Sequence, residues 1–180
     1  ELWAAPPTKG HPWKKVRDFP VCARSGDLGP KRQSGDYQVP EGFYHVDRFN
    51  PRSSFHLSLG INYPHIGDRA RTPKGASPGG DIFIHGDCVT IGCLPLLDPP
   101  MERLYVTAVA AKDAGQRRIP MHVFPCRFDK DSCQTLLNAY EAQDPSLGAF
   151  WETIRPGYLA FEATKIPPKV RATAKGYVIK

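Results

Sequence analysis

The stretch IFIHGDCVTIGCLP, residues 82–95, decides how the whole chain is interpreted, because a short apolar run leads into a glycine-bounded turn that carries two cysteines. Its first residues alternate between two faces, which predicts a half-buried strand that ends at His85. A cysteine, Cys93, follows eight positions later. Gly86 and Gly92 allow the tight backbone geometry that closes a short loop, so the pattern predicts that the histidine and the cysteine meet in space.

The residues before this stretch predict further strands separated by turns. In SSFHLSLGINYP, residues 53–64, apolar and polar side chains alternate, which places His56 on the face opposite the apolar ones. A loop rich in glycine and proline, residues 65–80, connects this strand to the next. The N-terminal region is broken up by Gly and Pro, and short strands are predicted within it at residues 1–5, 13–23 and 42–49.

After residue 95 the apolar period changes from two to about 3.6, as expected of helices. Asp98 is suited to cap a helix that starts at Pro99 and stops at Gly115, although the β-branched Val106 favours a strand there. The period returns to two over residues 119–128. Helices are predicted next over residues 133–140 and 147–154, before a C-terminal tail of strand-like segments.

Strands that come first and helices that join later predict an α+β fold, in which a few helices pack on a mixed, mostly antiparallel β-sheet. The length of 180 residues suits one domain, residues 1–180, and the 41% hydrophobic content is ordinary for a globular protein. With 16 glycines and 19 prolines, the chain is turn-rich rather than a helix bundle.

The formal net charge of +6 is spread over the chain, and no helix or aromatic strand carries a stripe of Lys and Arg. This argues against nucleic acid as a partner. The charge suits a solvated surface, or a polyanionic or carboxylate-rich substrate. No apolar run approaches the length of a membrane span, so the chain is not expected to cross a membrane.

The histidine and cysteine of residues 82–95 suggest nucleophilic chemistry. A cysteine attacks only as a thiolate, and His85 is the obvious base for Cys93. The absent side chain at Gly92 lets a substrate carbonyl approach the backbone, where the N–H groups of Gly92 and Cys93 could bind a developing oxyanion. The Thr90 hydroxyl could brace this turn.

These residues carry a resemblance to a known family. IHGDCVTIGCLP resembles the signature of the YkuD-type L,D-transpeptidases, which is a strand ending in His-Gly, a variable loop and then Ser/Thr-x-Gly-Cys. GDYQVPEGFYHV, residues 35–46, and FHLSLGINYP, residues 55–64, resemble more narrowly a YafK-like branch of it. The similarity covers roughly residues 25–128, and three ordered motifs are more specific than one Cys-His pair.

The resemblance implies a cysteine enzyme of the bacterial envelope or periplasm with a β-sandwich-like core and no cofactor or metal. Cys93 would attack the third residue of a peptidoglycan stem peptide and form a thioester, with His85 as the base and the Gly86 carbonyl orienting the imidazole. The acceptor decides between cross-linking, hydrolysis and exchange with an envelope lipoprotein. The family usually has a further N-terminal strand, so the resemblance also implies an N-terminally truncated domain.

Two departures from the family pattern weigh against the 3-3 cross-linking activity, so both transpeptidation and hydrolysis stay open. Most members carry Arg two positions after the cysteine, where this chain has Pro95, and the loop from His85 to Cys93 is short, as in the YafK-like branch. That branch is associated with hydrolysis of the peptidoglycan–lipoprotein amide link. An L,D-carboxypeptidase, and a binding module without catalysis, stay open as alternatives.

Other residues keep two interpretations. Some polar residues near the motifs are candidates to line a substrate cleft: His56, Tyr63, His65 and Arg71. The five cysteines form an odd set, so at least one lacks an intramolecular partner. Cys126 and Cys133 would form either a disulfide or two buried thiols. Cys88 suggests a loop or core thiol, and a zinc site of His85, Cys88 and Cys93 would need a fourth ligand.

Overall fold

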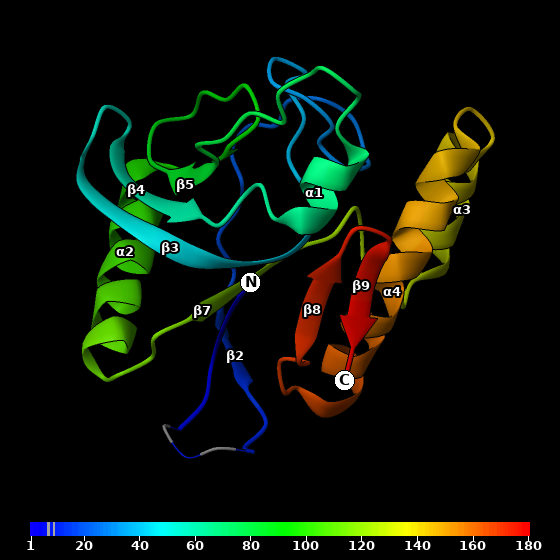
Figure 1. Ribbon diagram of the computed structural model, residues 1–180. Coiled ribbons are helices and arrows are strands. Elements are labelled where there is room, and N and C mark those ends of the chain that lie inside the picture. Colours follow the sequence, from blue (N-terminus) through cyan, green and yellow to red (C-terminus); the bar gives the residue numbers. More distant parts are fainter. Residues whose placement is uncertain (7, 9) are drawn as a thin grey trace.

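A curled five-stranded sheet in the order β6-β5-β4-β3-β7 organises the fold of the computed structural model, which describes residues 1–6, 8 and 10–180 (Figure 1). Adjacent strands in this sheet run antiparallel, except β5 and β6, which run parallel. The predicted α+β class with a mostly antiparallel sheet is confirmed. The strands of this sheet are β3 (Gly42–Ser53), β4 (His56–Ile61), β5 (Phe83–His85), β6 (Leu94–Pro95) and β7 (Ile119–Val123).

Two small hairpins and four helices complete the described chain. The N-terminal hairpin is β1 (Leu2–Ala4) with β2 (Lys14–Arg17), and the C-terminal one is β8 (Val170–Thr173) with β9 (Gly176–Ile179). The helices are α1 (Ile66–Arg71), α2 (Asp98–Asp113), α3 (Asp131–Glu141) and α4 (Pro145–Thr164). None of the helices among the residues described is long and apolar enough to span a membrane.

Helices cover the sheet through two apolar clusters. On β4 and β5, alternation buries Leu59 and Ile84 against Met101 and Ala108 of α2. At the other end, Phe43 packs with the apolar face of α3 and α4. Burial of an apolar side chain of this size is worth about 1.5–3 kcal/mol, so these clusters hold β3, β4 and β5 in one orientation.

Three predicted boundaries were wrong, each for a local reason. Asp98 lies inside the first turn of α2, and Leu97 takes the cap position without a side-chain bond. The loop over residues 65–80 contains α1, which begins because His65 and Asp68 cap each other's backbone groups, a role that histidine seldom signals. The strand predicted over residues 13–23 is only Lys14–Arg17, whose side chains are all exposed.

The last helix is longer than predicted because burial outweighs an internal proline. Pro156 lacks the N–H of a helical hydrogen bond and costs about 3 kcal/mol. The helix nevertheless continues to Thr164, since Trp151 and Ile154 before the proline and Tyr158 after it are all buried in one cluster. The tail then forms the β8–β9 hairpin, as its strand-like pattern indicated.

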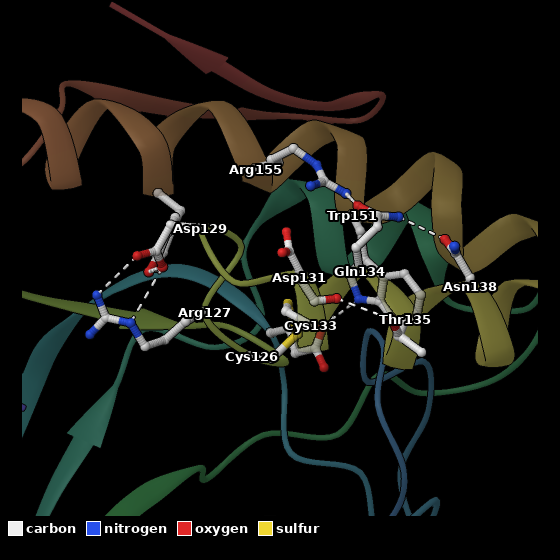
Figure 2. The surroundings of a disulfide bond; sticks show 12 residues. Cys126, Arg127, Asp129, Asp131, Cys133, Gln134, Thr135, Asn138, Trp151 and Arg155 are labelled. Atoms are coloured by element: carbon white, nitrogen blue, oxygen red, sulfur yellow. Dashed lines mark hydrogen bonds and ion pairs between the residues drawn. A yellow bond between two sulfur atoms is a disulfide. The ribbon is translucent and has the colours of Figure 1, made fainter.

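Cys126 and Cys133 form a disulfide seven positions apart, so the disulfide was the correct alternative. It joins the segment after β7 to the first turn of α3 (Figure 2). On the same helix, the side chain of Gln134 accepts from Arg155 of α4 at 3.1 Å and donates to Asn138 at 2.7 Å. The crosslink therefore fixes the place where α3 starts beside α4.

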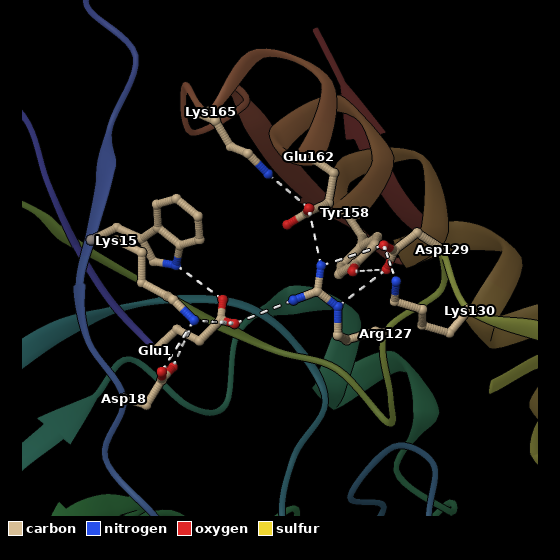
Figure 3. A network of polar contacts seen from close by, with 10 residues as sticks. Glu1, Lys15, Asp18, Arg127, Asp129, Lys130, Tyr158, Glu162 and Lys165 are labelled. Atoms are coloured by element: carbon tan, nitrogen blue, oxygen red, sulfur yellow. Dashed lines mark hydrogen bonds and ion pairs between the residues drawn. The ribbon is translucent and has the colours of Figure 1, made fainter. Parts of the chain in front are cut away.

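The N-terminal hairpin is tied to α4 by exposed charges. Arg127 donates to Glu1 and to Glu162 at 3.3 Å each, and Lys15 lies 3.7 Å from Glu1 (Figure 3). Asp129 accepts from the Tyr158 hydroxyl and from Arg127. Exposed pairs of this kind contribute roughly 0–1 kcal/mol each, so this network orients the hairpin more than it stabilises the fold.

Glu41 is a buried carboxyl group, 4% exposed, at the start of β3. Its Oε1 accepts from the Gly29 N–H at 2.7 Å and its Oε2 from the Trp151 indole N–H at 2.8 Å. Burial raises its pKa from 4.5 to about 7 in spite of these two bonds. The folded state therefore binds a proton more tightly here than the unfolded state does.

We expect Glu41→Gln to flatten the pH dependence of stability. The raised pKa adds about 3 kcal/mol, which is fully present below the unfolded pKa of 4.5 and lost as the pH rises through about 7. Partly buried His65 and His122, with pKa values lowered to about 4 by desolvation, act in the opposite direction and remain in both proteins. Urea unfolding at several pH values between about 5 and 8 measures the free energy of unfolding of both proteins. If that free energy changed with pH in the same way in both, the prediction would be wrong.

Candidate active site

The two residues singled out as nucleophile and base lie at the edge of the sheet, His85 at the end of β5 and Cys93 directly before β6. In the parallel β5–β6 pair, Ile84 is opposite Leu94 and His85 is opposite Pro95, which places Cys93 beside Phe83. Because side chains alternate along a strand, Ile84 and Leu94 point into the cluster under α2, and His85 points to the opposite face of β5. The pairing of β5 with β6 therefore brings the backbone of Cys93 next to the strand that carries the imidazole.

Cys93 is half-buried and is the free cysteine among the residues described. Its sulfur accepts from the Phe83 N–H at 3.4 Å, and the thiol donates to the Asp81 carbonyl at 3.7 Å. Burial raises the pKa of the thiol, whereas the Phe83 N–H and the Lys31 ammonium act to lower it. Within the described chain no hydrogen bond joins this sulfur to His85, so β5 backbone groups hold the resting thiol.

His85 is 3% exposed, and its ring is held from two sides. Its Nδ1 lies 2.6 Å from the Gly86 carbonyl oxygen, and the Phe55 ring packs 4.9 Å away. A carbonyl only accepts, so Nδ1 carries the proton and Nε2 is left as a proton acceptor. This is the tautomer that a base for a thiol needs.

Thr90 organises the turn before Cys93. Its hydroxyl accepts from the N–H groups of Gly92 at 3.1 Å and Cys93 at 2.8 Å, and donates to the Cys93 carbonyl at 2.8 Å. The two N–H groups suggested for an oxyanion are therefore bonded to Thr90 in this structure. Gly92 has φ +136°, and a Cβ there would lie 3.2 Å from the Gln38 carbonyl, so the turn requires glycine.

The loop between His85 and Cys93 is also anchored from outside. A disulfide joins Cys88 to Cys22, and the Cys22 N–H donates to the Pro95 carbonyl at 3.1 Å. The Asp98 carboxylate accepts from the Asp87 N–H at 2.8 Å. The interpretation of Cys88 as a thiol or zinc ligand was wrong, because its sulfur is bonded to Cys22. The described residues contain no cluster of three or more metal-binding side chains.

The four residues suggested for substrate binding make contacts within the fold. The His56 ring is 2.9 Å from Glu102 of α2, and the Tyr63 hydroxyl donates to the Pro78 carbonyl at 2.8 Å. His65 caps α1 and bonds Tyr177 at 2.8 Å, and Arg71 lies 4.6 Å over the Phe150 ring. Their contribution to substrate binding stays a prediction.

Sequence reasoning missed a polar centre that underlies the GDYQVPEG stretch. The Asp36 carboxylate accepts from the Lys31 ammonium at 2.5 Å and from the backbone N–H groups of Arg32, Gln33 and Gln38 at 2.8–3.0 Å. Lys31 is buried. Lysine is seldom buried unless an anion pairs with it, and the sequence alone does not show that Asp36 is that anion. Asp36 belongs to the GDYQVPEGFYHV motif, but its carboxylate was assigned no role from the sequence.

An apolar cavity of about 770 Å³ lies on the opposite face of the sheet edge, against Ile84 and Leu94. The N-terminal hairpin covers it with Trp3 and Val16, and α2 closes one side with Ala108. This second layer gives the core its sandwich-like character. Cys93 and His85 do not line the cavity, because alternation turns them to the other face.

A comparison of the sequence with known proteins finds two relatives that match most of this chain. The chain is 32% identical over 172 residues to "Putative L,D-transpeptidase YafK" of Escherichia coli strain K12, and equally so to the protein of that name from Escherichia coli O157:H7. The match takes in 94% of this chain and 66% of each relative, so the chain spans just under two thirds of their length. No protein-family profile matches the chain.

Solved structures give more distant similarities. The helical cell shape determining protein Pgp2 from Campylobacter jejuni is 16% identical, over 84% of this chain and 62% of its own, with a TM-score of 0.40. Bd1075 from Bdellovibrio bacteriovorus is 18% identical, over 88% of this chain and 68% of its own, with a TM-score of 0.41.

Proposed function

Since the chain belongs to the L,D-transpeptidase family, we propose that it is an envelope enzyme that transfers acyl groups of peptidoglycan stem peptides through a thioester on Cys93. The observation that supports this proposal is the parallel pairing of β5 and β6, which places Cys93, directly before β6, beside the strand that ends in His85, with the Gly86 carbonyl holding the imidazole in the accepting tautomer. A thiol and a proton acceptor near each other are the minimum that acyl transfer requires.

The proposed reaction begins when His85 Nε2 takes the proton of the Cys93 thiol. The sulfur attacks the carbonyl carbon of the third stem residue, and the tetrahedral intermediate collapses as the amine of the next residue leaves with the proton from His85. This gives a thioester and a free D-amino acid or peptide. Water or a second amine then attacks the thioester carbonyl, transfers its proton to His85, and releases the thiol.

The oxyanion of the intermediate needs donors that are already in place. The N–H groups of Gly92 and Cys93 are the donors proposed for the oxyanion, and both donate to Thr90 Oγ1 in this structure. We assign Thr90 to hold this turn, and its hydroxyl would rotate away when the oxyanion replaces it.

Hydrolysis is the outcome that we favour, with the lipoprotein–peptidoglycan amide or a stem-peptide carboxypeptidase substrate as the two candidates. Pro95 stands where the resemblance expects an arginine, which removes a cation from the acceptor side. The two disulfides support an oxidising compartment such as the periplasm. A peptidoglycan-binding module without turnover is the alternative from another class.

The test is to incubate the protein with purified stem-peptide fragments, quench in acid and record the intact mass. We expect an acyl adduct on Cys93, and tripeptide or released lipoprotein as product; new dimeric stems after addition of an amine acceptor would indicate transpeptidation instead. Protein whose Cys93 is alkylated beforehand is the control. Turnover that survives alkylation would exclude Cys93, and binding without adduct or product would identify a binding module.

A further inference from the structure

Arg48 of β3 lies on the face of the sheet that carries His85. In the strand pairing Arg48 is opposite Gly60 of β4, and Gly60 is opposite Phe83 of β5. Residues opposite each other point to the same side of a sheet, and so do Phe83 and His85, which are two positions apart on one strand. The Arg48 guanidinium lies 4.8 Å over the Phe83 ring, which agrees with this register. A cation therefore lies on the sheet face of the proposed base, next to the residue whose N–H holds the Cys93 sulfur.

Two local features aim this side chain across the sheet. The register shifts between Val46 and Arg48, so Val46 and Phe49 both pack in the cluster under α2 while Arg48 points the other way. Gly60 leaves the surface of β4 bare, and a Cβ there would lie 2.8 Å from the Arg48 Nε and 3.0 Å from the Phe83 ring. The irregular register and the glycine together let an arginine of β3 reach β5.

Asp81 joins the arginine to the proposed nucleophile. Its carboxylate accepts from the Arg48 Nη1 at 2.5 Å, and its carbonyl accepts from the Cys93 thiol at 3.7 Å. Asp81 has φ +54°, a left-handed conformation that is uncommon outside glycine and that clusters at functional sites. Because one residue holds both groups, the guanidinium has a defined place relative to the sulfur.

The guanidinium keeps binding capacity for a ligand. Its five N–H groups make three bonds within the described part of the chain, to the Asp47 carboxylate at 3.1 Å, to Asp81, and to the Ile61 carbonyl at 3.4 Å. Two N–H groups are left over among these residues, and 41% of the Arg48 side chain is exposed. The Asp81 side chain is 79% exposed, and an exposed ion pair contributes little to stability, so another carboxylate can replace it at the arginine.

We propose that Arg48 binds the free carboxylate of the residue that leaves when Cys93 attacks the donor. In a stem peptide only one α-carbon separates this carboxylate from the nitrogen of the scissile amide, so the carboxylate must lie close to the sulfur. A guanidinium binds a carboxylate through two parallel N–H bonds, which fixes the orientation of the donor.

This inference deepens the proposed function, and it rests on that function in taking Cys93 as the nucleophile and stem peptides as the donors. The substrate class that it names is narrower. It consists of stem peptides in which the residue after the scissile amide ends in a free α-carboxylate.

The experiment measures by calorimetry how tightly two stem peptides bind the Cys93→Ala protein, which does not consume them. One peptide ends, after the third residue, in a D-amino acid with a free carboxylate, and the other ends in the matching carboxamide. We expect the carboxylate peptide to bind at least about tenfold more tightly, and Arg48→Met in the same background to remove this difference. Arg48→Lys keeps the charge without the fork of N–H groups and should retain part of it.

Arg171→Met is the matched control, because Arg171 is an exposed arginine on β8 of the C-terminal hairpin. It should keep the full preference for the carboxylate, and thermal unfolding reports whether each variant folds. If Arg48→Met does not fold, the two peptides still decide with Arg48 in place, since equal affinities would overturn the proposal. The proposal also fails if folded Arg48→Met keeps the preference, or if it binds both peptides more weakly by one factor, as a structural role would predict.

The two proposals fail separately. A preference for the carboxylate that depends on Arg48, together with no acyl adduct on Cys93 in the unaltered protein, would leave a stem-peptide binding module without catalysis. An adduct that forms while both peptides bind equally would retain the function and remove Arg48 from it. Binding of neither peptide would overturn both.

Discussion

Replacing Cys93 by alanine is expected to slow turnover of stem peptides by at least about 10³-fold, and His85→Ala should slow it by a similar factor. The double variant should be no slower than either single one, because a proton acceptor without a thiol, or a thiol without its acceptor, loses the same step. This expectation follows from the proposal that His85, in the tautomer set by Gly86, takes the proton of the Cys93 thiol.

The rate of product release by each variant, measured by mass spectrometry under single-turnover conditions, checks this expectation. His11→Ala provides the control, since His11 is exposed, carries no motif and should leave the rate unchanged. Losses that add up, with the double variant about 10³-fold below the singles, would mean that the two residues act in separate steps.

The position of the candidate pair in the fold could be predicted from the sequence because the signal is local. Alternation over residues 82–85 places His85 at a strand end, and the glycines on either side of the loop return the chain to the neighbouring strand at Cys93. The second layer, the α2 helix and most strands followed from periodicity for the same reason. The spacing of residues along one strand and one turn is enough to predict where His85 and Cys93 lie in the fold.

The supports of the site could not be predicted, because their partners are far apart in the sequence. Cys22 and Cys88 are separated by 66 positions, and no spacing in the chain specifies which cysteine pairs with which. Gln38 lies against Gly92 only because the fold packs two loops together. Pairings of this kind depend on tertiary structure, and a single sequence does not display them.

Removal of the Cys22–Cys88 disulfide is expected to cost the fold more than removal of the Cys126–Cys133 one. Closing a loop of 66 residues restricts the unfolded chain by about 4 kcal/mol, against about 2 kcal/mol for a loop of seven. A loss of about 4 kcal/mol is a large part of the net stability of about 5–15 kcal/mol that a domain has. The double serine variants Cys22→Ser/Cys88→Ser and Cys126→Ser/Cys133→Ser should show this order in urea unfolding.

The two crosslinks should also differ in their effect on chemistry. Cys88 lies in the loop between His85 and Cys93, so its release frees the anchor of that loop, whereas the second disulfide joins α3 to the segment after β7. We therefore expect turnover to fall only in the Cys22→Ser/Cys88→Ser variant. The paired change is needed because a lone Cys88 thiol, five positions from Cys93, could exchange with it. Equal stability losses with unchanged turnover in both variants would show that the loop is held by Asp98 and Thr90 instead.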